Sequence, residues 1–174
     1  GSVFLDDALA KKKGISYICA RHECSAVIMA EAVAKLKNNI GVAVVTTGPG
    51  GTNAMPGVIE SWVDSTPILI ISGQVNTGEI INDRTFGLQG FNIIENVNKF
   101  TKYAITLTDK NKIKYHLKKA IHEAKSGRPG PAWIDIPMDI QSQIINPSDL
   151  IDFIPPEKKE FLDSLEIKEY KEGD

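Results

Sequence analysis

Residues 42–72, VAVVTTGPGGTNAMPGVIESWVDSTPILIIS, carry the pattern that decides the fold. Val42–Thr47 is a continuous, largely β-branched run, which is typical of a strand buried on both faces of a sheet. The glycine-rich residues Gly48–Asn53 predict a turn, and Ala54–Val63 predicts a helix. Pro67–Ser72 predicts a second buried strand. A strand, a helix of about ten residues and another strand indicate a βαβ unit, whose two strands are parallel.

The same alternation extends in both directions from this unit. Upstream, the sequence predicts a helix around Phe4–Lys12, a short strand at Ile15 and Tyr17–Ala20, and a helix over Glu23–Lys37. Downstream elements are expected at Phe91–Asn98 (helix), Tyr103–Leu107 (strand), Lys110–Lys125 (helix, capped by Asp109 and closed by Gly127) and Ala132–Ile136 (strand, stopped by Pro137). The predicted fold is α/β, a flavodoxin-like three-layer sandwich with a mostly parallel central sheet.

The two ends of the chain lead to expectations about its domain organisation. The first predicted element is a helix, so we expect the first strand of the sheet to be missing and Gly1-Ser2 to be either native or a cloning scar. Residues 1–145 are expected to form the domain. Residues 146–174, with Pro147, Pro155, Pro156 and a tail rich in Lys and Glu, are expected to be a linker toward an absent central domain. We therefore expect one domain of a longer enzyme.

Composition excludes several classes of protein. The 174 residues include 20 Lys+Arg and 22 Asp+Glu, a formal charge of −2, and 42% are hydrophobic, which argues against a disordered chain. Without a basic cluster or an apolar run of about 20 residues, we expect neither nucleic acid nor membrane as a partner. Two cysteines, Cys19 and Cys24, can form neither a disulfide framework nor a four-ligand zinc site. We expect both to be core or near-core thiols of a cytoplasmic protein.

Two features are candidates for chemistry, and each also has a purely structural explanation. The Gly48–Asn53 turn lies between a strand and a helix, where backbone N–H groups can approach an anion, but glycine also serves turn geometry alone. Its sequence is neither a P-loop nor Gly-x-Gly-x-x-Gly, and Pro49 lacks an N–H. Glu23 begins a helix, where the helix dipole alone favours a carboxylate. It also lies at the sheet edge where open α/β folds bind ligands.

Taken together, the short motifs are more specific than any of them alone. They are RHE at 21–23, TTGPGGTN at 46–53, WVDSTP at 62–67, SGQ at 72–74, TKY at 101–103, GRPGP at 127–131 and IDIP at 134–137. This series resembles the N-terminal, pyrimidine-binding domain of thiamine diphosphate enzymes of the acetolactate synthase group. The resemblance covers roughly Phe4 to Pro156. The variant GPGGTN with ISGQ looks most like the acetolactate-synthase-like enzymes of bacterial surface-sugar pathways.

The resemblance implies a role for four residues. Glu23 matches the glutamate that hydrogen-bonds N1′ of the cofactor's aminopyrimidine and so promotes formation of the thiazolium ylide. Pro49 and Asn53 match the loop beside the pyrimidine ring. Gln89 resembles a glutamine that reaches the active site, although relatives commonly have Gln-Glu where this chain has Gln89-Gly90. A carboxyl that exchanges a proton with N1′ suits this chemistry, whereas an amide does not.

The resemblance also implies what this chain lacks. The Mg²⁺ and diphosphate site of the group follows a Gly-Asp-Gly motif, and the only Gly-Asp here is Gly173-Asp174. We therefore expect no metal ligand in this chain, with Mg²⁺ held by an absent domain and FAD as an optional cofactor of the parent enzyme. The implied enzyme is a carboligase or 2-keto acid decarboxylase acting on a substrate such as pyruvate. It is expected to be a homodimer or homotetramer, and the isolated chain is expected to be inactive.

Two alternatives from other classes remain at this point. One is a non-catalytic α/β module for assembly or nucleotide binding, which has no need of a carboxyl in a cleft at the sheet edge. The other is a flavodoxin-like mononucleotide binder, which needs hydroxyl-rich phosphate contacts in its first loop. Glu23 together with the Gly-Pro-Gly turn favours the enzyme.

Overall fold

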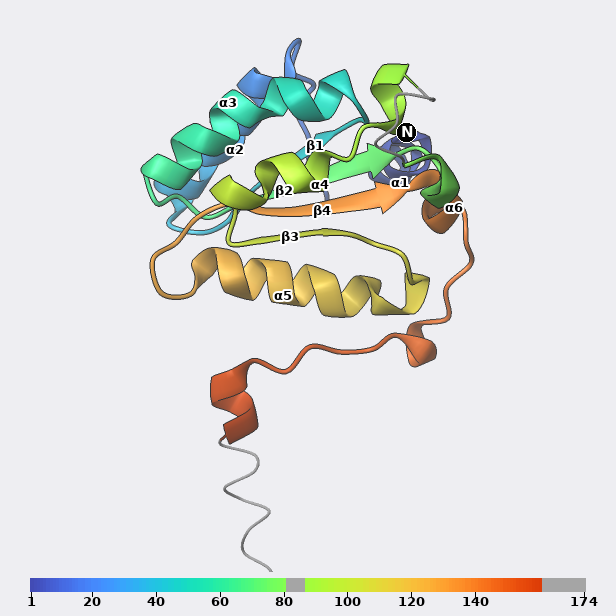
Figure 1. Cartoon of the computed structure of the whole chain (residues 1–174). Helices are drawn as coiled ribbons and strands as arrows, with labels where there is room; N and C mark the ends of the chain where they lie inside the picture. The colour runs from blue at the N-terminus through green and yellow to red at the C-terminus, as the bar shows by residue number, and fades with distance from the viewer. Residues whose placement is uncertain (81–86, 161–174) are drawn as a thin grey trace, which may run out of the picture.

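The computed structural model describes residues 1–80 and 87–160. Its helices and strands alternate along most of the chain (Figure 1). They are α1 (Val3–Lys11), α2 (Glu23–Lys37), β1 (Gly41–Val45), α3 (Pro49–Val63), β2 (Ile68–Gln74), α4 (Ile93–Val97), β3 (Tyr103–Thr106), α5 (Ile113–Lys125), β4 (Ala132–Pro137) and α6 (Met138–Gln141). Short 3₁₀ turns occur at η1 (Thr77–Glu79), η2 (Gly87–Gly90), η3 (Asn98–Phe100), η4 (Lys110–Lys112) and η5 (Pro147–Asp149).

The four strands form one parallel sheet in the order β1-β2-β4-β3. Val45 of β1 lies opposite Ser72 of β2, and Ser72 lies opposite Asp135 of β4. Because all strands run in the same direction, their carboxyl ends meet at one edge of the sheet, which is where open α/β folds bind ligands. The predicted flavodoxin-like sandwich with a parallel sheet is confirmed.

Helices cover both faces of the sheet and give the fold two hydrophobic cores (Figure 1). On one face, α2, α3 and α4 bury Val27, Ala54, Val58 and Ile93 against the sheet. On the other face, Ala120 and Ala124 of α5 pack against Leu69 and Ile134, which project from β2 and β4. Strands between two helical layers are therefore apolar on both sides, as the run at Ile68–Ile70 is.

The strand predicted at Ile15 and Tyr17–Ala20 is wrong. These residues lie in an irregular segment, and the side chains of Ile15, Tyr17 and Ile18 are 50%, 57% and 81% exposed. β-branched residues favour a strand only where a neighbour supplies hydrogen bonds, and this segment pairs with no strand of the described sheet. Cys19, predicted to be in or near the core, is exposed with this segment, while Cys24 is half-buried.

Two details of the predicted βαβ unit are also wrong. β1 is an edge strand, so Val42 is 51% exposed instead of buried on both faces. The turn is shorter than predicted, because α3 begins at Pro49 instead of Ala54. Gly48 makes the turn almost alone, with a φ of +59° that favours glycine, and proline is well suited to the first helical position that follows.

The other predicted elements are confirmed within a few residues, and α2 has the predicted bounds. Asp109 caps the turn before α5 by accepting a hydrogen bond from the Asn111 backbone N–H at 3.0 Å. β4 includes Pro137, which was expected to stop it. Among the residues that the structure describes, no helix is long and apolar enough to cross a bilayer.

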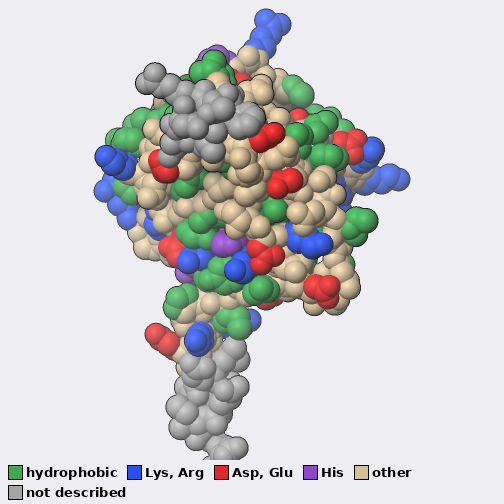
Figure 2. Space-filling model, turned by 45° about the vertical axis from the view of Figure 1, so that its right-hand side comes forward, with side chains coloured by type: hydrophobic (Ala, Val, Ile, Leu, Met, Phe, Trp, Pro, Cys, Tyr) green, Lys and Arg blue, Asp and Glu red, His purple; other side chains and the backbone are tan. Residues whose placement is uncertain are grey.

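The described part of the C-terminal segment lies along α5 (Figure 1). Asp152 forms ion pairs with Lys114 at 2.8 Å and Lys118 at 2.5 Å, and the Phe153 ring packs edge-on against Tyr115. In the space-filling view, basic, acidic and His side chains mix where this segment leaves the body (Figure 2). Residues 156–160 are helical, whereas residues 161–174 lie outside the described residues. The predicted boundary near residue 145 stays a prediction.

Candidate active site

Glu23 lies at the start of α2, at the carboxyl edge of the sheet. His22 caps this helix, because its Nδ1 accepts a hydrogen bond from the Cys24 backbone N–H at 3.2 Å. Asn53, in the first turns of α3, donates from Nδ2 to Glu23 Oε2 at 3.1 Å, and both side chains are half-buried. The structure therefore brings together two of the predicted site residues from different helices.

Close packing between α2 and α3 makes this contact geometrically possible. A Cβ at Gly57 of α3 would lie 2.9 Å from the Val27 side chain of α2. Only glycine allows the two helix backbones to approach this closely, and the approach carries Asn53 to within hydrogen-bonding distance of Glu23.

The glycine turn lies beside the same carboxylate. A Cβ at Gly50 would come within 2.8 Å of the Thr46 Cγ2 and 3.8 Å of Glu23 Oε1. Pro49, the third predicted residue, is exposed at the first position of α3. The absence of a side chain at Gly50 thus lets the start of α3 pack closely against Thr46, near Glu23.

Gln89, the fourth predicted residue, reaches the same edge through η2. The Thr47 Oγ1 donates to the Gln89 carbonyl oxygen at 2.7 Å. A Cβ at Gly48 would lie 2.4 Å from the Leu88 carbonyl oxygen and 3.3 Å from the Gln89 Cα, so the two backbones are in contact. The Gln89 side chain is exposed. Glu23, Asn53, Pro49 and Gln89 therefore converge on one edge of the sheet, although their roles stay predictions.

Comparison with known protein families shows the family to which this chain belongs. The family described as "Thiamine pyrophosphate enzyme, N-terminal TPP binding domain" matches residues 3–94, which are more than half of the chain. The chain belongs to this family. Thiamine pyrophosphate is thiamine diphosphate, so the sequence-based recognition is confirmed at the level of the family and the cofactor.

Curated relatives of this thiamine pyrophosphate domain are acetolactate synthases. Acetolactate synthase isozyme 3 large subunit of Escherichia coli is 37% identical over 159 residues, which are 90% of this chain and 26% of the relative. The large subunit of Lactococcus lactis is 38% identical over 138 residues, 79% of this chain and 24% of the relative. The chloroplastic acetolactate synthase of Arabidopsis thaliana is 34% identical over 147 residues, 84% of this chain and 22% of the relative. The chain thus spans about a quarter of the length of these relatives.

The residues at the carboxyl edge fit the pyrimidine end of thiamine diphosphate. A carboxyl group and two side-chain amides can pair with ring nitrogens and an exocyclic amino group. Gly50 lets the α3 backbone approach Thr46 and Glu23 closely, because a Cβ there would lie 2.8 Å from the Thr46 Cγ2. Glu23, Asn53 and Gln89 carry no positive charge, so they suit the ring better than the diphosphate.

Sequence reasoning missed a buried polar cluster behind this edge of the thiamine pyrophosphate domain. Gln74 and Asp135 are 0% exposed, and Gln74 Nε2 donates to Asp135 Oδ2 at 3.0 Å. Ser72 donates to the other Asp135 oxygen and accepts from Trp133 Nε1 at 2.7 Å. The only signal in the sequence is that polar residues interrupt two otherwise apolar buried strands.

Burial determines the acidity of Asp135. Loss of contact with water raises the pKa of its carboxyl from 3.8 to about 6, and hydrogen bonds from Ser72, Gln74 and Thr106 oppose the rise. The Asp135 carboxyl therefore stays protonated to a higher pH than an ordinary aspartate does.

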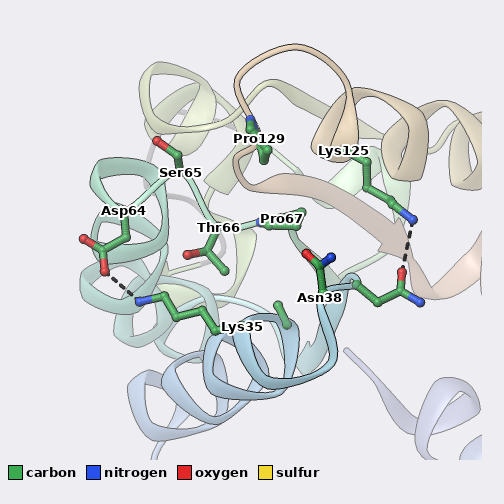
Figure 3. A pocket seen from close by; sticks show the side chains of 10 residues that line it. Lys35, Asn38, Asp64, Ser65, Thr66, Pro67, Lys125 and Pro129 are labelled. Atoms are coloured by element: carbon green, nitrogen blue, oxygen red, sulfur yellow. Dashed lines mark hydrogen bonds and ion pairs between the residues drawn. The ribbon is translucent and has the colours of Figure 1, made fainter.

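Two hollows in the domain surface lie away from these residues. The larger, with a volume of about 340 Å³, lies at the opposite edge, where Asn39, Pro67 and Pro129 precede their strands (Figure 3). Its charged groups have partners within the chain, because Lys35 pairs with Asp64 at 2.7 Å and Lys125 with Asn39 at 3.1 Å. The second hollow, of about 190 Å³, is mostly apolar and lies between α1, α5 and α6. Neither contains Glu23, Asn53 or Gln89.

Proposed function

We propose that the chain is the pyrimidine-binding domain of a thiamine diphosphate-dependent carboligase or 2-keto acid decarboxylase similar to acetolactate synthase. The observation that carries this proposal is the hydrogen bond between Asn53 and Glu23 at the carboxyl edge, beside the Gly48 turn. A module for assembly alone has no use for a half-buried carboxyl placed in this way. Residues 1–145 form the domain, and residues 146–174 lead to further domains.

Glu23 is the residue that exchanges a proton with N1′ of the pyrimidine. When bound, thiamine diphosphate supplies the nucleophilic carbon that attacks a 2-keto acid such as pyruvate. With the cofactor bound, Glu23 would hold a proton at N1′ of the pyrimidine ring. Asn53 orients the carboxyl by donating to Oε2, which leaves Oε1 nearer the glycine turn. Pro49 and Gln89 border the ring.

The binding sites for Mg²⁺, for the diphosphate and for any FAD lie outside this chain. Mg²⁺ and the diphosphate are held by another domain, and FAD is an optional cofactor of the parent enzyme. The parent is a homodimer or homotetramer in the cytoplasm. An exposed apolar stripe on α2 supports self-association, because the side chains of Ile28, Val33 and Leu36 are 42%, 42% and 87% exposed.

The test is the Glu23→Gln variant of the parent enzyme. Glutamine keeps the size and the hydrogen bond from Asn53 but cannot transfer a proton, so exchange of the C2 hydrogen of bound thiamine diphosphate is expected to slow by about 10²–10⁴-fold. The measurement is hydrogen–deuterium exchange at C2 followed by acid quench and NMR.

Binding of thiamine diphosphate is expected to change much less, because its diphosphate is anchored elsewhere. Asn53→Ala is the matched variant, since it leaves the acid in place without its partner and is expected to cause a smaller loss. Equal exchange rates in wild type and Glu23→Gln would remove Glu23 from this role.

A further inference from the structure

The segment Leu88–Phe91 is attached to the body of the domain through its backbone. Thr47 donates to the Gln89 carbonyl oxygen at 2.7 Å, and Gln74 Nε2 donates to the Phe91 carbonyl oxygen at 3.1 Å. Both donors are buried, whereas the Leu88 side chain is 76% exposed and the Gln89 side chain is also exposed. Phe91 also packs against the core of the domain. The backbone around the exposed Leu88 and Gln89 side chains is thus held by hydrogen bonds from two buried side chains.

Gln74 is saturated with hydrogen bonds, and this fixes its orientation. Its Nε2 donates to Phe91 and to Asp135, and its Oε1 accepts from the Val75 backbone N–H at 2.9 Å. The Thr47 hydroxyl also points to Oε1, and it shares its single hydrogen between this oxygen and the Gln89 carbonyl oxygen. Both amide hydrogens and the oxygen have partners, so a flip of the amide would break every one of these bonds. One residue therefore connects the end of β1, the centre of β4 and the segment that carries Gln89.

The cost of loosening this arrangement is high because it is buried. A buried carbonyl or amide that loses its hydrogen-bond partner is neither solvated nor paired, which costs free energy. The hydrogen bonds of Gln74 and Thr47 are therefore expected to be kept or broken together. The Gly48 backbone lies directly beneath Leu88, where a Cβ would be 2.4 Å from the carbonyl oxygen. The backbone of the segment therefore lies against the glycine turn, at the same edge of the sheet as Glu23.

We propose that Gln74 and Thr47 are positioning residues, whose buried side chains hold the Leu88–Phe91 backbone against the Gly48 turn and so place Gln89 at the cofactor edge beside Glu23. This inference rests on the proposed function, because it assigns Gln89 to the thiamine diphosphate site. Both side chains are buried behind this edge of the sheet. Their effect on the reaction is transmitted through the backbone of the segment.

The variants for the test differ by single groups. Thr47→Val removes the hydroxyl that reaches Gln74 and Gln89, and Thr47→Ser restores it. Gln74→Met removes the whole amide at similar length. Ser72→Ala is the matched control, because it removes hydrogen bonds to Asp135 and Trp133 within the same cluster without a contact to Leu88–Phe91.

The first measurement is amide hydrogen–deuterium exchange of residues 87–91 in the 174-residue chain. Thr47→Val and Gln74→Met are expected to raise the exchange rate of this segment by about 3- to 10-fold, the range for one net hydrogen bond. Thr47→Ser and Ser72→Ala are expected to stay within about twofold of wild type there. If Gln74→Met does not fold, the three remaining variants still decide the result. Equal effects of Thr47→Val and Ser72→Ala on this segment would overturn the inference.

The second measurement is steady-state kinetics of the same variants in the parent enzyme. Misplacement of a site residue by a fraction of an ångström lowers the rate of the chemical step, so Thr47→Val is expected to lower kcat by about 10-fold or more, with rescue by Thr47→Ser. The KM for thiamine diphosphate is expected to change less than threefold. A wild-type kcat in Thr47→Val, or an equal loss in Ser72→Ala, would overturn the inference. Absence of thiamine diphosphate-dependent turnover in the wild type would refute the proposed function instead, and the exchange measurement would then decide alone whether the segment is held.

Discussion

The buried carboxyl of Asp135 is expected to make the stability of the domain fall as pH rises through 6. Asp135 is 0% exposed, and burial raises its pKa from 3.8 in the unfolded chain to about 6 in the folded domain. A group with a raised folded-state pKa contributes fully below pH 3.8 and loses that contribution as pH rises through about 6. The difference of about two pH units, at about 1.4 kcal/mol each, corresponds to about 3 kcal/mol.

The assay compares urea unfolding of wild type and Asp135→Asn between pH 4 and 8. Asparagine does not titrate, so the difference between the two curves isolates Asp135 from all other groups. We expect the free energy of unfolding of wild type to fall relative to the variant by up to about 3 kcal/mol across this range and then to level off.

Ser72→Ala is the matched second variant. The hydrogen bond from Ser72 lowers the pKa of Asp135, so its removal is expected to move the midpoint of the fall to higher pH. The titration of Asp135 can also be followed directly by carboxyl ¹³C NMR. A difference between wild type and Asp135→Asn that is independent of pH, or that grows in favour of wild type as pH rises, would refute the reasoning.

Two further predictions concern the glycine turn and α2. Gly48→Ala is expected to destabilise the domain by about 1–3 kcal/mol in urea unfolding, because the residue has a φ of +59° and its Cβ would lie 2.4 Å from the Leu88 carbonyl oxygen. Gly78→Ala is the control, because Gly78 has open space around it, and its free energy of unfolding should stay within about 0.5 kcal/mol of wild type. Equal losses in the two variants would contradict the special role of Gly48 in the turn. Leu36→Lys on the exposed stripe of α2 should lower the average mass measured by light scattering at high concentration, and a wild type that is strictly monomeric would rule out self-association of the chain through this stripe.

The elements that sequence predicted well are those whose pattern is local. α2 has strong helix formers and a regular apolar face, and β2 and β4 are short apolar runs bounded by proline and glycine. The prediction of a strand at Tyr17–Ala20 was wrong because a strand needs a neighbouring strand to pair with, and composition does not reveal whether one is present. The early start of α3 at Pro49 was missed because a single glycine with positive φ completes the turn.

The candidate site also has a part that the sequence predicted and a part that it did not. The resemblance to the family placed Glu23, Pro49, Asn53 and Gln89 in one group, and the structure brings them to one edge of the sheet. The partners behind them could not be predicted. Gln74 and Asp135 are far apart in the chain, and only strand pairing between β2 and β4 brings them together. A polar residue in an apolar strand signals that a partner exists but does not identify it.

The strand order has a consequence for how this domain folds during synthesis. Among the strands that the structure describes, β4 comes last in the sequence, yet it lies inside the sheet, between β2 and β3. Ser72 and Asp135, which face each other across its boundary, are 63 residues apart. On the ribosome β3 therefore has no strand to pair with, and one side of β2 stays open, until the residues through Pro137 have emerged. Long-range parallel pairing is intrinsically slow, so the strand order leaves the edges of β2 and β3 unpaired during much of the synthesis of this domain.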